Sequence, residues 1–248
     1  IDPRLLQVRL GAVVTGVSWQ PGEVRVETRS PAGAPLEPCR AAKLIVTLPL
    51  GVLQAPPGAP GAVRFSPELP EKQQALSRLR MGPVVKVVLR FREAVWEAGG
   101  RGQMGFLHLP AEPFPTWWTA LPFRVPVLTG WAGGPAAERL SRGSDEAILD
   151  AGLATLSRAL SLPRAQLDAQ LQAWHVCNWQ TDPFARGAYS YVLVGGESAV
   201  AALARPVERT LFFAGEATEG GFSGTVSAAL ASGHRAAAEV LGQAGAGR

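Results

Sequence analysis

The alternation of apolar and polar residues along the chain predicts a set of short strands. Residues 84–91, rich in valine, form the clearest strand, and residues 24–28 alternate as a half-buried strand does. Residues 10–17 are apolar enough to be the strand that pairs with 24–28. Apolar runs at 44–48 and 211–215 indicate buried strands. Further strands are expected at 104–109, 116–120, 126–131 and 170–179.

Three other segments favour helices. Ser144 is a good N-cap, and two acidic residues follow it in the first turn of a helix that extends to about residue 160. A short helix is expected at 71–80 and a helix of small residues at 224–241. Segments rich in proline and glycine, 30–38 and 55–70, are expected to be connections. This mixture of elements predicts an α/β fold of the mixed (α+β) kind.

Composition narrows the class of protein. Apolar residues make up 47% of the chain and charged residues 18%, as in a globular protein with a core. The net charge of +4 comes from dispersed arginines, so no nucleic-acid partner is expected. The longest apolar run, 44–53, is too short to span a membrane, and residues 1–3 do not begin a signal peptide. Cys39 and Cys177 lie far apart without ligand spacing, which predicts a reduced, cytoplasmic chain with no metal site.

Isolated histidines and acidic residues offer little evidence for catalysis. His108, His175 and His234 each stand alone, and a lone histidine needs a partner to act as a base. Asp182 and Glu197 could line a cationic pocket but are more typical of turns or the surface. We therefore expect structural or surface roles for all five.

The last strand, loop and helix form a pattern that can bind an anion. The strand at 211–215 leads into a glycine-bearing loop, and the helix after Ser223 begins with free N–H groups and partial positive charge. Gly224 and the alanines that follow it leave room for another group to approach closely. An ordinary packed strand–helix unit explains the same pattern, because glycine loops are common.

These residues resemble the C-terminal FAD motif of flavin-containing amine oxidases, which includes 212–218, Thr225-Val226 and 232–237. Upstream, 179–191 resembles the Trp…Asp-Pro…Gly-x-Tyr segment of that family. Residues 47–53 and 86–91 match further family segments in the same order. The resemblance covers nearly the whole chain and is greatest to the polyamine oxidase and lysine-specific histone demethylase branch.

The resemblance implies contacts with FAD at the end of the chain. Glu216 and the backbone around Gly215 are expected to face the ribityl–pyrophosphate part. Thr225 and Val226, at the helix start, are expected to face the pyrimidine edge, where the helix dipole would stabilise negative charge on the reduced ring.

The resemblance implies further contacts from the first quarter of the chain. Val14 matches a valine on the adenine side, and Thr47 and Pro49 match the loop that closes over the cofactor.

Monoamine oxidases attach FAD through a cysteine, but Ala188 occupies that position here. The resemblance therefore implies non-covalent FAD.

Lys86 interrupts an apolar strand. Alternation places it on one face with Val84 and Val88, where burial would lower the pKa of the amine. A lysine that reaches solvent, or one on an edge strand, explains the pattern equally well. In the family that this chain resembles, the matching lysine holds a water near flavin N5. The resemblance thus implies a catalytic role for Lys86.

Aromatic residues gather in one stretch, and their faces suit an amine and an isoalloxazine ring. Trp179, Phe184 and Tyr189 are expected to form this wall, with ordinary core packing as an alternative for Phe184 and Tyr191. Monoamine oxidases place two tyrosines before the flavin; Tyr189 matches one, and Thr225 stands in place of the other. Tyr189 is the second expected catalytic residue.

One motif of the class is absent. Dinucleotide binders of this kind carry Gly-x-Gly-x-x-Gly between a strand and a helix, and no segment here has it in that context; the glycines from 99 to 105 are not placed between a predicted strand and a predicted helix. We therefore expect a truncated FAD-binding domain of Rossmann type, residues 1–60 and 205–248, that lacks an N-terminal FAD-binding segment. Residues 61–204 are expected to form an inserted substrate domain with a mixed sheet.

The resemblance implies the parent reaction, which is oxidation of a C–N bond of a small-molecule amine by hydride transfer to FAD. Reoxidation by O2 and hydrolysis of the imine follow. Two alternatives stay open. The chain could be a non-catalytic remnant or a subunit that needs a separate FAD-binding chain, or another FAD oxidoreductase with the same scaffold; Lys86 argues against the last.

Overall fold

The computed structural model describes residues 4–100 and 102–242, and the chain divides into two compact units. The first unit combines Ile1–Met81 with Pro183–Arg248, and the second is Gly82–Asp182. These limits differ from the expected boundaries at 60/61 and 204/205, because one apolar cluster of the first unit joins residues from both sides of each boundary: Leu50 with Ala75, and Leu203 with Ala217. Residues 1–3 and 243–248, which belong to the expected domains, lie outside the described residues. So does Arg101, which belongs to the glycine cluster at 99–105.

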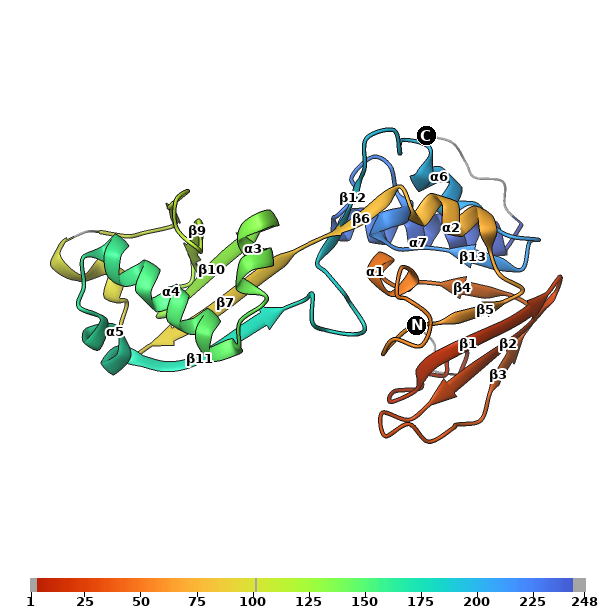
Figure 1. The fold of residues 1–248 in the computed structure, drawn as a ribbon, viewed down its shortest axis with the longest axis horizontal. Coiled ribbons are helices and arrows are strands. Elements are labelled where there is room, and N and C mark those ends of the chain that lie inside the picture. Colours follow the sequence, from red (N-terminus) through yellow and green to blue (C-terminus); the bar gives the residue numbers. More distant parts are fainter. Residues whose placement is uncertain (1–3, 101, 243–248) are drawn as a thin grey trace. The chain divides into compact units, whose positions relative to one another are not determined.

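The first unit contains three small sheets (Figure 1). The largest has the order β3-β2-β1-β5, in which β1 pairs antiparallel with β2 and parallel with β5. The other two are the parallel pair β13-β4 and the pair β12-β6. Their strands are β1 (Val13–Gln20), β2 (Glu23–Arg29), β3 (Cys39–Ala41), β4 (Leu44–Val46), β5 (Arg64–Ser66), β6 (Leu79–Gly82), β12 (Tyr189–Val192) and β13 (Leu211–Phe213).

Among its described residues, the first unit also has four α-helices and one 3-10 turn. They are α1 (Leu50–Leu53), α2 (Pro70–Leu76), α6 (Ala199–Ala204), α7 (Val226–Val240) and the turn η2 (Glu216–Thr218). Helix α2 packs against α6, while α7 contacts both β13 and η2. The chain therefore leaves β13, makes the turn η2 and returns along α7, as expected for the strand–loop–helix.

The second unit is built on a five-stranded antiparallel sheet. Its order is β11-β7-β10-β9-β8, so that β7 lies inside the sheet with β11 and β10 on either side. The strands are β7 (Val84–Phe91), β8 (Phe106–His108), β9 (Thr116–Thr119), β10 (Val127–Gly133) and β11 (Leu171–Asn178). The helices are η1 (Val95–Gly100), α3 (Gly134–Leu140), α4 (Asp145–Leu160) and α5 (Arg164–Gln170).

Strand β7 supplies the core of the second unit. Val85, Val87, Leu89 and Phe91 are fully buried and pack with apolar residues of α4. Gly152 lets α4 approach closely, since a β-carbon there would lie 3.4 Å from atoms of Val87 and of Trp117. The predicted alternation of β7 is confirmed on this face.

Candidate functional site

A cavity of about 220 Å³ in the first unit brings together four residues expected to contact the cofactor. Thr47 and Pro49 approach from the segment after β4, and Gly215 and Glu216 from the end of β13. The strands β4 and β13 are parallel neighbours, so their carboxyl ends open at the same edge. Ala188, at the position expected to lack a flavin-linking cysteine, also lines this cavity. Ligand pockets usually measure roughly 300–1,000 Å³, so this cavity fits only part of a large cofactor.

Gly215 has a backbone conformation that favours glycine almost exclusively. Its φ of 137° and ψ of 165° fall in a region that other residues scarcely occupy. A β-carbon at Gly215 would meet no described atom within 4 Å, so open space lies in front of its backbone. A glycine held in this conformation before open space fits a position where a ligand approaches the main chain.

The Glu216 carboxylate is occupied by protein donors. One oxygen accepts a hydrogen bond from the Ser190 backbone N–H at 3.1 Å; the other accepts from the Ser190 hydroxyl at 2.7 Å and from the Gly224 N–H at 2.8 Å. Glu216 thus ties β12 and the loop before α7 to η2. Its expected contact with the ribityl–pyrophosphate part stays a prediction.

Helix α7 begins at Val226, two residues after the predicted start. The hydroxyl of Thr225 accepts a hydrogen bond from the Ala228 N–H at 3.1 Å, as an N-cap does. Val226 follows and is 78% exposed. Tyr189 of β12 lies beside this loop, with side-chain atoms 3.6 Å from the position of a β-carbon on Gly224. The structure therefore places Tyr189 next to the start of α7, with its side chain partly exposed.

Val14 lines a second, larger cavity of about 1100 Å³ in the same unit. The two cavities share Leu53, Leu203 and Phe213 in their walls. Phe213 is the last residue of β13 and is almost fully buried. The expected adenine-side residue thus lies in a cavity adjacent to the one that contains Thr47 and Gly215.

Lys86 lies on the face of β7 opposite the core of the second unit. Its direct cross-strand neighbours are Trp131 on β10 and Cys177 on β11. Since β7 has a strand on each side, the edge-strand explanation for Lys86 is wrong. The side chain is partly buried, and among the described residues its amine has no hydrogen-bond or ion-pair partner.

The two other expected aromatic contacts belong to different units. Trp179 follows β11 in the second unit and is 40% exposed. Phe184 lies in the first unit, 53% exposed, close to Gly61. Core packing is therefore not the role of Phe184, nor of Tyr191, which is also exposed. Whether these rings contact a flavin or an amine stays a prediction.

No histidine lines either of these cavities. His108 stacks on Phe106 with nearly parallel rings, His175 lies on β11 opposite Val88, and His234 belongs to α7. Across residues 4–100 and 102–242, no three His, Cys, Asp or Glu side chains gather as a metal site would require. Within the same residues, no helix has the length and apolar character needed to cross a bilayer.

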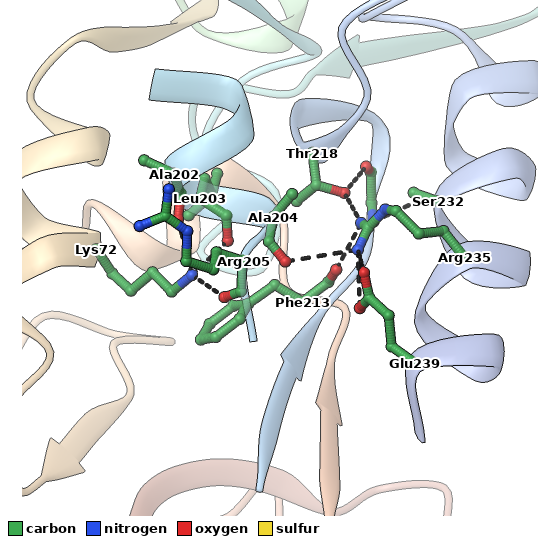
Figure 2. A network of polar contacts seen from close by, with 11 residues as sticks. Lys72, Ala202, Leu203, Ala204, Arg205, Phe213, Thr218, Ser232, Arg235 and Glu239 are labelled. Atoms are coloured by element: carbon green, nitrogen blue, oxygen red, sulfur yellow. Dashed lines mark hydrogen bonds and ion pairs between the residues drawn. The ribbon is translucent and has the colours of Figure 1, made fainter. Parts of the chain in front are cut away.

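The sequence alone assigned no role to a polar network around the end of β13, next to the smaller cavity. Figure 2 shows Lys72 against Phe213, with Ser232, Arg235 and Thr218 around the end of β13. Ser232 and Arg235 belong to the family-like segment 232–237 and were detectable there. Only one feature of Lys72 was visible in the sequence. It is one of three lysines in a chain that otherwise uses arginine.

Burial changes the chemistry of Lys72. Only 4% of this residue is exposed, and its amine donates to the carbonyls of Ala202, Leu203 and Arg205 at the end of α6. The amine also lies 4.2 Å from the centroid of the Phe213 ring. Loss of hydration, followed by the positive charge of Arg205, lowers the pKa of Lys72 to about 8.

The cavity at the ends of β4 and β13, with the turn and helix that follow β13, fits a protein that binds a cofactor. Comparison with known proteins identifies the family. A sequence profile described as flavin containing amine oxidoreductase matches residues 2–241, so the chain belongs to that family. Within it, the chain is similar to lysine-specific histone demethylase 2 of Homo sapiens, with 31% identity over 243 residues. That match covers 95% of this chain and 28% of the demethylase. Polyamine oxidase 2 of Arabidopsis thaliana is 31% identical over 239 residues, covering 94% of this chain and 44% of that protein. The expected branch is confirmed.

Solved structures support the same fold. A putrescine oxidase redesigned for cofactor binding matches with a TM-score of 0.75 and 19% identity, over 94% of this chain and 49% of that one. Cyclohexylamine oxidase from Brevibacterium oxydans matches with a TM-score of 0.70 and 24% identity, over 93% and 48%. The predicted mixed α/β class is confirmed, and the chain spans less than half the length of each of these four relatives.

Proposed function

We propose that this chain supplies the cofactor-facing and substrate-facing residues of an FAD-dependent amine oxidase. The observation that carries the proposal is the cavity at the carboxyl ends of β4 and β13. Four residues expected to contact the cofactor, from segments more than 160 positions apart, meet there: Thr47, Pro49, Gly215 and Glu216. A chance likeness of short motifs would give no reason for these residues to line one cavity.

Other residues of the first unit would hold FAD around this point. Val14, in the adjoining cavity, would face the adenine part, while Thr225 and Val226 would present the start of α7 to the flavin. Phe184 would provide an apolar face, and Trp179 is a further candidate for such a contact. Since Ala188 offers no thiol, FAD would be held without a covalent bond at this position. When bound, FAD would accept the hydride that leaves the carbon next to the amine nitrogen.

Two residues would act on the reacting groups. Tyr189 would present an aromatic face to a small-molecule amine. Lys86 would orient a water molecule with its amine, which lacks a partner among the described residues. O2 is the proposed oxidant that regenerates FAD. The second unit, with its five-stranded sheet, is the proposed substrate domain.

The direct test combines a binding measurement with an activity screen. FAD titration, followed by flavin fluorescence, reports binding, and a screen for hydrogen peroxide across polyamines, cyclic amines and lysine peptides reports oxidation. We expect saturable FAD binding, and peroxide with at least one amine class. The proposal would be contradicted if neither this chain nor a longer protein that contains it bound FAD or produced peroxide with any of these amines.

One observation favours a second candidate, a subunit that depends on a separate FAD-binding chain. The sequence carries no Gly-x-Gly-x-x-Gly between a strand and a helix. The 248-residue chain should then bind FAD much more tightly after a segment with that motif is added. Equal affinity with and without the added segment would rule out this candidate.

A further inference from the structure

We propose that Ser232, Arg235 and Thr218 are positioning residues that fix the turn 213–218 in the conformation that receives FAD. This inference rests on the proposed function. Figure 2 shows the three side chains converging on the turn from α7 and η2.

Helix α7 binds the turn through two residues three positions apart. The Ser232 hydroxyl accepts a hydrogen bond from the Gly215 N–H at 2.9 Å and donates to the Ala229 carbonyl at 2.7 Å. Arg235 donates to the Phe213 carbonyl at 2.9 Å and to the Thr218 hydroxyl at 3.1 Å. Both side chains project from one face of α7 because residues three and four apart lie together on a helix.

Thr218 closes the arrangement from inside the turn. Its hydroxyl accepts from Arg235 and donates to the Gly215 carbonyl at 2.8 Å. The N–H and C=O of Gly215 are therefore both held by hydroxyl groups, although this glycine has a conformation that other residues scarcely adopt. Ser232 is fully buried and Thr218 is 7% exposed, so water does not replace these bonds readily.

The guanidinium group of Arg235 is itself fixed in place. Its other terminal nitrogen forms an ion pair with both carboxylate oxygens of Glu239, at 3.0 and 3.1 Å. A planar guanidinium held from one side presents its remaining donors in a set direction. The turn is thereby preorganised before any cofactor binds, which lowers the ordering cost of binding.

The test uses isosteric variants and two independent readouts. Ser232→Ala removes one hydroxyl, and Thr218→Val removes the other while keeping its shape; Thr218→Ser restores that hydroxyl. Ser157→Ala is a matched control in the second unit, where the Ser157 hydroxyl donates to the Leu162 carbonyl at 2.6 Å. Amide hydrogen exchange in the cofactor-free protein reports the turn, and FAD titration with visible spectra reports the cofactor.

We expect Ser232→Ala and Thr218→Val to accelerate exchange in 211–220 and to weaken FAD binding about 5- to 20-fold, with a shifted flavin spectrum. Thr218→Ser should bind FAD within about twofold of wild type. Ser157→Ala should lower the melting temperature without changing FAD affinity or spectrum. The inference is overturned if the two hydroxyl deletions leave FAD binding and spectrum unchanged, or if Ser157→Ala weakens binding equally. A wild-type protein without saturable FAD binding, alone or with an added Gly-x-Gly-x-x-Gly segment, would instead contradict the proposed function and the cluster's role in it.

Discussion

The Glu216 carboxylate accepts hydrogen bonds from both the backbone N–H and the hydroxyl of Ser190, and so connects the turn after β13 to strand β12. Ser190 is buried, while its neighbours Tyr189 and Tyr191 point to the exposed face of the strand. These bonds hold Ser190 on the inner face of β12, and alternation along the strand places both tyrosines on the opposite face. A carboxylate that the motif resemblance places near the cofactor therefore also ties down the strand that carries Tyr189, an expected catalytic residue.

Glu216→Gln is expected to lower the free energy of unfolding of the first unit by about 1–3 kcal/mol. All three groups that face the carboxylate donate hydrogen bonds, and an amide nitrogen in its place leaves at least one donor unpaired. Urea unfolding measures the change. Glu219→Gln, three residues away, is the control and should stay within about 0.5 kcal/mol of wild type. Equal stability of the two variants would contradict this role of Glu216.

Gly215→Ala is expected to destabilise the protein by about 1–3 kcal/mol, although a β-carbon there meets no described atom. The cost arises from the backbone, whose φ of 137° and ψ of 165° exclude most other residues. Gly220→Ala is the control, because Gly220 has open space without a positive φ. Both variants can be compared by thermal and urea unfolding. A Gly215→Ala protein as stable as Gly220→Ala would show that the turn relaxes freely.

The flavin is expected to leave the protein on acid precipitation. Ala188 lines the smaller cavity with a methyl group, which offers no nucleophile for a covalent bond. After precipitation of FAD-loaded protein, the yellow colour should appear in the supernatant. Flavin that stays in the washed pellet would mean that another residue forms the bond.

Lys86→Met is expected to leave the melting temperature unchanged or raise it, because a partly buried amine without a described partner is removed. Flavin reduction or reoxidation should slow by at least about tenfold, equivalent to roughly 1.4 kcal/mol of barrier. Stopped-flow absorbance of FAD-loaded protein separates the two half-reactions. Arg90→Met is the matched control, since Arg90 is exposed on the same strand. Wild-type rates in both half-reactions would leave Lys86 without a catalytic role.

Local patterns predicted the long elements well. Strand β7 has the predicted bounds, and α4 begins after Ser144, whose hydroxyl accepts from the Ala147 N–H. Several elements of three or four residues, α1, β3, β5, β6 and β12, were missed, since so few residues contain no periodicity. Strand β5, for example, lies inside a segment that proline and glycine marked as a connection, and it is held there by pairing with β1. The helices α3, α5 and α6 were missed as well, and residues 79–80, expected to end a helix, belong to β6.

Local sequence patterns could not predict which residues, distant in the sequence, contact one another in the fold. Alternation placed Lys86 on one face with Val84 and Val88, but only strand register shows Trp131 and Cys177 beside it. The bonds from Ser232 to Gly215 and from Glu216 to Ser190 join residues 17 and 26 positions apart. Motifs identified the residues around the cavity, while the side chains that hold them in place required the fold.

The low pKa of Lys72 predicts an unusual pH dependence of stability. The pKa is about 8 in the folded protein and 10.5 as the ordinary value, so between these limits the unfolded chain binds more protons. Stability from this residue is therefore constant below about pH 8 and rises through the window up to about pH 10.5. The rise should be on the order of 1 kcal/mol per pH unit. Lys72→Met lacks the titrating amine and serves as the reference that cancels all other groups.

Urea unfolding of wild type and Lys72→Met at pH 7, 8, 9 and 10 measures this difference. The amine caps three carbonyls at the end of α6 and faces the Phe213 ring, contacts that favour the charged form. Burial opposes them and is the larger effect, which is why the pKa falls rather than rises. A wild-type advantage over Lys72→Met that grows from pH 8 to pH 10 supports this balance. An advantage that shrinks over the same range would show that the carbonyls and the ring outweigh the loss of hydration, so that Lys72 stays charged in the core.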